Sequence, residues 1–116
     1  MVLITENDVV VYVRPSRYMT RDKREEVYKA ACLFLNELLD RKDRKVEVII
    51  SVRGAGLAEH VDGYCLCTEE HDNGKPREIF VEVRGDRGLD FLIKCLAHEI
   101  THVWQMITGR IPEREY

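Results

Sequence analysis

Residues 95–105 read Cys-Leu-Ala-His-Glu-Ile-Thr-His-Val-Trp-Gln and contain the pattern His-Glu-x-x-His. Residues four apart on an α-helix share one face, so His98 and His102 can direct imidazole nitrogens at one metal ion. Glu99 lies about 100° around the helix from His98. In zinc sites of this pattern the glutamate accepts a proton from the attacking water and does not bind the metal. The stretch therefore predicts a zinc site with His98 and His102 as ligands and Glu99 as general base.

The residues around this pattern predict that it lies on an amphipathic helix. Gly88 is a start signal for the helix and Gly109 a stop signal. Apolar residues recur at spacings of three and four, which is the periodicity of a helix packed on a core: Leu89, Leu92 or Ile93, Leu96, Ile100, Val103 or Trp104, and Ile107. The two histidines fall on a neighbouring face. The alternative is a polar face with two exposed histidines, but motif, helix and position together favour metal binding.

Length and composition predict one globular domain over residues 1–116. With 34% charged residues the chain reads as a soluble protein, and a net charge of −3 argues against a domain that binds nucleic acid directly. The apolar run at the N-terminus is too short for a signal peptide and lacks a basic flank, and no stretch has the length of a transmembrane helix. We therefore expect a cytoplasmic protein without a membrane partner.

The chain has four cysteines, which we expect to be reduced thiols. Cys65 and Cys67 are two residues apart rather than three, and no second pair exists to complete a zinc ribbon. Cys32 and Cys95 lie in helical patterns among apolar residues and are expected to be buried.

The order of elements predicts an α+β fold. A β-branched strand over 8–13 ends at a proline, and a helix follows from Thr20 as N-cap to about Arg41. Three strands come next, over 46–52, 61–67 and 78–83, the last two joined by a turn over 68–77. We expect a small mixed sheet of about four strands with two helices, the C-terminal one carrying the histidine motif. An edge strand beside that helix could hold an extended peptide by backbone hydrogen bonds.

This arrangement resembles the zincin metallopeptidases and, more narrowly, the small SprT-like group with its related short bacterial or phage proteins. The resemblance rests on Gly-Tyr-Cys at 63–65, the strand at 79–83 and the helix at 96–105. It implies a minimal zincin-like domain that binds Zn²⁺ and acts on a protein or peptide substrate. It also implies that His98 and His102 are zinc ligands and that Glu99 serves as catalytic base and acid.

Zincins require a third protein ligand, which SprT-like proteins take from a later histidine. No histidine follows the motif here, and residues 111–115, Ile-Pro-Glu-Arg-Glu, are similar to a Pro-x-Glu-x-Glu-like segment of related short sequences. The resemblance therefore favours Glu113 as third ligand, ahead of Glu115. His60 and His71 are upstream alternatives from loops.

We therefore predict a zinc-dependent metallopeptidase that hydrolyses peptide bonds through a metal-activated water, with Glu99 as general base. Tyr64 and Tyr116 are candidate donors to the oxyanion.

The alternative is a catalytically inactive zincin-like protein that acts as a peptide- or protein-binding module. A third interpretation is a chance motif on a core helix. SprT-like proteins that act on DNA-bound substrates carry a DNA-binding extension not seen here, so direct nucleic-acid contact is not expected. The sequence leaves the oligomeric state open.

Overall fold

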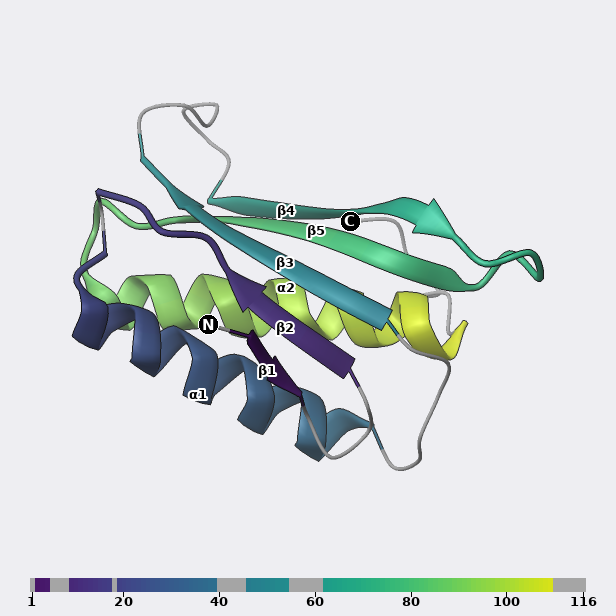
Figure 1. The fold of residues 1–116 in the computed structure, drawn as a ribbon. Helices are drawn as coiled ribbons and strands as arrows, with labels where there is room; N and C mark the ends of the chain where they lie inside the picture. Colours follow the sequence, from purple (N-terminus) through teal and green to yellow (C-terminus); the bar gives the residue numbers. More distant parts are fainter. Residues whose placement is uncertain (1, 5–8, 18, 40–45, 55–61, 110–116) are drawn as a thin grey trace.

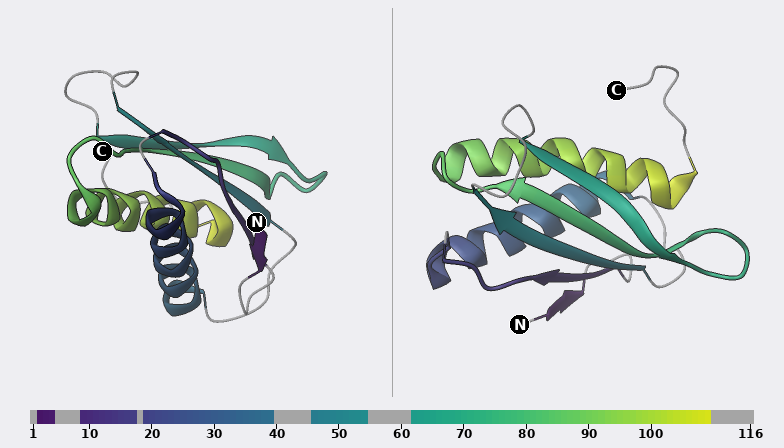
Figure 2. Two further views of the ribbon diagram at one scale, coloured as in Figure 1. Left: turned by 60° about the vertical axis from the view of Figure 1, so that its left-hand side comes forward. Right: turned by 90° about the horizontal axis from the view of Figure 1, so that it is seen from above.

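Five strands form one mixed sheet, and two helices cover one of its faces (Figures 1 and 2). The computed structural model describes residues 2–4, 9–17, 19–39, 46–54 and 62–109. In chain order the elements are β1 (Val2–Ile4), β2 (Val9–Val13), α1 (Arg21–Leu38), β3 (Val46–Arg53), β4 (Gly63–Glu70), β5 (Pro76–Arg84) and α2 (Leu89–Thr108). The predicted α+β fold with two helices and a mixed sheet is confirmed.

The sheet has the order β1-β2-β3-β5-β4, with parallel pairs at its centre and antiparallel pairs at its edges. β3 pairs in parallel with both β2 and β5, whereas β1 pairs antiparallel with β2 and β4 pairs antiparallel with β5. The parallel β2–β3 pair requires a crossover, which α1 supplies. β4 is the outermost strand on the side of α2, so the predicted edge strand does lie next to the helix of the histidine motif.

The core lies between the sheet and the two helices. Alternate residues of β2, β3 and β5 point toward the helices, as the two-residue period of a strand requires. The helices meet them with apolar side chains, from the predicted stripe of α2 Leu92, Leu96, Ile100, Val103 and Ile107, and from α1 Val27, Ala31 and Leu35. Of the alternatives left open for α2, Leu92 and Val103 are in the core, while Ile93 and Trp104 are only partly buried against it.

The ends of both helices follow the predicted signals, with one difference. The Thr20 hydroxyl accepts a hydrogen bond from the Lys23 N–H at 3.3 Å, which caps α1. α1 ends at Leu38 rather than near Arg41, because Leu39 is already extended (φ −95°, ψ 122°). α2 ends at Thr108 and is capped by Gly109, whose φ of +71° is the left-handed conformation that glycine adopts without strain.

The strands differ from the prediction in number and length. β1 was not predicted, because three residues are too few for a periodicity to be read. β4 begins at Gly63 rather than at residue 61, but it continues to Glu70, and β5 begins already at Pro76. The turn between them is therefore tighter than 68–77: the His71 N–H donates to the Lys75 carbonyl and the Gly74 N–H to the His71 carbonyl. Cys32 and Cys95 are partly buried rather than buried, and all four cysteines are free thiols.

Candidate metal centre

The two histidines of the motif lie together on the surface of α2. Their Nε2 atoms are 3.2 Å apart, and the rings meet nearly edge to face, with an interplanar angle of 82°. Zinc–nitrogen bonds of 2.0–2.1 Å at a tetrahedral angle place two ligand nitrogens about 3.3 Å apart. The separation therefore fits joint ligation of one zinc ion by His98 and His102. When no ion lies between them, the same separation lets the rings share a hydrogen bond.

Gln105 fixes the orientation of His102. The Gln105 Oε1 atom lies 3.0 Å from the His102 Nδ1 atom. An amide oxygen only accepts hydrogen bonds, so this contact requires the proton of a neutral imidazole to be on Nδ1. The lone pair then resides on Nε2, the atom that faces His98 and that a metal would bind. Such an outer partner is typical of histidine ligands. Gln105 was not predicted as a site residue, although its spacing of three from His102 is the signal that identifies it.

Glu99 is buried between α2 and the edge strand β4, and its exposed fraction is only 5%. The strand residue closest to it is Gly63. A Cβ atom on Gly63 would lie 3.3 Å from both Cγ and Oε2 of Glu99, and 2.9 Å from the Glu82 carbonyl oxygen. The carboxylate therefore packs against bare backbone, and a larger residue at position 63 would displace it. In the sequence, Gly63 is part of the family resemblance only, and its contact with Glu99 could not be predicted because that contact depends on how β4 lies against α2.

Cys65 provides a hydrogen-bond donor for the buried carboxylate. Burial raises the pKa of Glu99, while the electrostatic effect of the nearby His98 and His102 and the hydrogen bond from the Cys65 thiol partly oppose that rise. Burial, the Glu99 charge and the same hydrogen bond raise the pKa of Cys65 to about 12. Cys65 is therefore a neutral thiol that donates to Glu99. A carboxylate of raised pKa next to a metal site has the basicity that a general base needs near neutral pH.

A hollow of about 490 Å³ opens beside Glu99. The start of β4 forms one wall, and α2 forms the other with Phe91, Lys94, Cys95 and His98. Its volume is that of a site for a small ligand or a few side chains of a peptide. The candidate base and one candidate metal ligand thus line a concave surface next to a strand at the edge of the sheet.

The remaining predicted ligands are not brought to this pair by the part of the chain that the structure describes. His71 lies in the turn between β4 and β5, where its backbone closes the hairpin. Within the described ranges, no three His, Cys, Asp or Glu side chains form a group that could hold a metal ion. Glu113, Glu115 and His60 lie outside the described residues.

The prediction that Tyr64 donates to an oxyanion at this site is wrong. Gly63 and Cys65 face α2, so the alternation of a strand directs Tyr64, which lies between them, to the opposite face of the sheet. There its ring contacts Phe80, with 6.3 Å between ring centroids. The other candidate donor, Tyr116, lies outside the described residues.

Compared with known proteins, the chain matches no family model, no curated protein and no solved structure. Neither helix in the described part of the chain is long and apolar enough to cross a membrane. The interpretation of the site therefore depends on its own geometry: a histidine pair at zinc-ligand spacing beside a buried carboxylate.

The environment of Cys65 predicts its reactivity. The pKa of Cys65 is raised to about 12 and that of Cys67 by less, so iodoacetamide, which reacts with the thiolate, should modify Cys67 before Cys65. In the Glu99→Gln variant the neighbouring negative charge is gone, which favours the thiolate and should speed the labelling of Cys65. Peptide mass spectrometry over a time course measures both rates. Equal labelling rates of Cys65 and Cys67 in the protein without the substitution would contradict the contact between Cys65 and Glu99.

Proposed function

We propose that this protein is a zinc-dependent metallopeptidase, the activity that its resemblance to the zincins implies. The observation that carries the proposal is the 3.2 Å separation of the His98 and His102 Nε2 atoms beside the buried Glu99. Two imidazoles at that separation suit zinc, and a carboxylate one residue from the first of them suits a general base.

Zinc would be held by His98, His102 and a third ligand. We expect that ligand to be Glu113, with Glu115, His60 and His71 as the alternatives to test. When bound, zinc supplies a Lewis acid that makes a water molecule more acidic and polarises the carbonyl of the peptide bond.

Glu99 would move the proton during hydrolysis. Its carboxylate takes a proton from water as the water oxygen attacks the carbonyl carbon, and it gives that proton to the amine nitrogen as the C–N bond breaks. Burial raises the pKa of Glu99 and so favours proton capture, while the Cys65 hydrogen bond and the close contact with Gly63 hold the carboxylate in one position. Gln105 orients His102 in the same way.

The substrate would be an extended peptide lying along β4. This strand is the last of the sheet in the described part of the chain, so its outer edge offers backbone groups for pairing with a further strand. The hollow beside Glu99 would receive a substrate side chain between Phe91 and Lys94. We further propose a cytoplasmic location, which the four free thiols support.

The second candidate function is a zincin-like module that binds peptides without cleaving them. The specific observation in its favour is that the described residues supply two candidate ligands and no third. A peptide could dock on β4 in this case as well, so peptide binding alone does not separate the two functions. Zinc binding and peptide hydrolysis do separate them.

The first prediction of this proposal concerns zinc content. Purified protein supplemented with zinc should hold about one ion per chain, and His102→Ala should abolish this binding because a single histidine remains. Gln105→Ala should weaken zinc binding by about 10- to 100-fold, since it frees the His102 ring. Elemental analysis and competition with a chelating dye measure these effects. His71→Ala should retain its zinc, and a loss there would assign the third ligand to His71 instead of Glu113.

The second prediction concerns the role of Glu99. Glu99→Gln should keep its zinc and lose hydrolysis of an unfolded protein such as casein by about 10²- to 10⁴-fold, because the amide cannot accept the proton. Glu47→Gln, which makes the same change on an exposed residue of β3, should retain full activity. A protein that holds zinc but cleaves no more casein than Glu99→Gln would be the binding module.

A further inference from the structure

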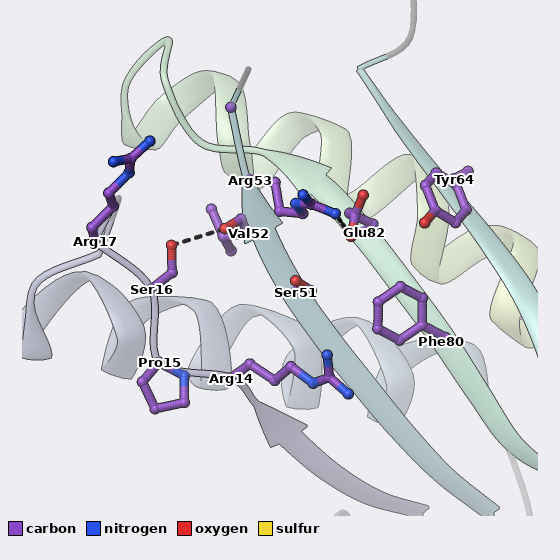
Figure 3. A pocket seen from close by; sticks show the side chains of 11 residues that line it. Arg14, Pro15, Ser16, Arg17, Ser51, Val52, Arg53, Tyr64, Phe80 and Glu82 are labelled. Carbon is purple, nitrogen blue, oxygen red and sulfur yellow. Dashed lines mark hydrogen bonds and ion pairs between the residues drawn. The ribbon is translucent and has the colours of Figure 1, made fainter. Parts of the chain in front are cut away.

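A second hollow lies on the face of the sheet opposite the helices (Figure 3). Its volume is about 560 Å³, and its walls come from the segment after β2, from the end of β3, and from outward residues of β4 and β5. Neither the histidine motif nor the proposed peptidase function uses this hollow. It therefore requires a separate explanation.

The floor of this hollow consists of outward side chains from three neighbouring strands. Ser51, Glu82 and Tyr64 are paired across β3, β5 and β4 and form a polar row. Phe80, two residues before Glu82 on β5 and therefore on the same face, adds an apolar ring to the floor. A ligand on this floor would therefore meet hydrogen-bonding groups and an apolar surface side by side.

Two arginines extend over the floor and are held in place. The Arg14 guanidinium lies 5.4 Å from the centre of the Phe80 ring, and an Arg53 Nη1 atom lies 3.7 Å from Glu82 Oε2. Figure 3 shows Ser51 between them, where its short side chain leaves room for Arg14 to pass over β3. A cation–π contact uses the flat face of the guanidinium, whereas its N–H groups point outward in the plane of the group. The contact with Phe80 therefore does not use the N–H groups of Arg14. Both arginines are thus positioned to bind an anion before one arrives.

The charge of this hollow is opposite to that of the whole chain. The chain carries a net charge of −3, yet among the described residues that line the hollow Arg14 and Arg53 extend over its floor and Glu82 supplies the single carboxylate. Glu82 is only 3% exposed and lies against Arg53, so its charge is compensated locally. The accessible part of the hollow is therefore positive.

We propose that this hollow binds a small organic anion. Arg14 and Arg53 would hold its phosphate or carboxylate group, since guanidinium groups bind both through paired hydrogen bonds. Its apolar part would lie on Tyr64, which is 36% exposed, and on the edge of Phe80. The volume is within the range of small-molecule sites. The site is independent of the metal centre, because it lies on the other face of the sheet.

Titration of the protein with phenyl phosphate, benzoate and inorganic phosphate at low ionic strength tests this proposal. We expect saturable binding of phenyl phosphate or benzoate, and the tighter of the two shows whether the natural ligand carries phosphate or carboxylate.

Arg14→Gln and Arg53→Gln should each weaken binding about tenfold, because each removes charged hydrogen bonds. Arg21→Gln, which removes the same charge from an 82% exposed side chain on α1, should leave binding unchanged. Tyr64→Ala should abolish the preference for phenyl phosphate over inorganic phosphate.

Amide chemical shifts locate the bound anion even if a variant folds poorly. Shifts confined to Ser16, Gly54 and their neighbours, and unchanged in His102→Ala, would support the site. Shifts centred on Phe91 and Lys94 would overturn it, because they would place the anion beside the metal centre. Absence of saturable binding, or an equal loss in Arg21→Gln and Arg14→Gln, would overturn it as well.

Discussion

The burial of the Glu99 carboxylate between α2 and β4 is the constraint on which the candidate site depends. A buried carboxylate destabilises a fold unless it is hydrogen-bonded or paired with positive charge. Here the Cys65 thiol donates to it, and the two histidines lie on the same helix next to it. Gly63 lets the strand approach closely enough for these contacts. The fold and the proposed chemistry are therefore coupled, because displacing β4 would leave Glu99 without its donor.

Adjacent faces of α2 carry the core residues and the residues of the candidate metal centre. Ile100 and Val103 are fully buried in the core, whereas His98 and His102 lie at the surface and Glu99 lies at the boundary between them. A helix allows this because consecutive residues are rotated by about 100°. β4 divides its residues in the same way: Gly63 and Cys65 face Glu99, and Tyr64 faces the hollow on the other side of the sheet. One edge strand thus lines both candidate sites.

The parts of the structure that depend on local signals could be predicted from the sequence. The stripe on α2, the Thr20 cap, the stop at Gly109 and the pairing of the two motif histidines all follow from spacings within a few residues. The contacts of Glu99 with Gly63 and Cys65 could not be predicted, because they depend on how α2 lies against a strand about 35 residues earlier in the chain. Nor could the burial of Glu82 be predicted, because it depends on Arg53 reaching across from the neighbouring strand β3. The hollow on the open face was missed for the same reason.

X-ray absorption at the zinc edge of the zinc-loaded protein is the decisive measurement for the proposed zinc site, because it identifies the atoms bound to the metal. We predict two imidazole ligands, with every atom bound to zinc being nitrogen or oxygen at about 2.0–2.2 Å. A signal from sulfur at about 2.3 Å would contradict it. That result would mean that cysteines hold the zinc, and it would leave His98, His102 and Glu99 without the metal that their arrangement suits.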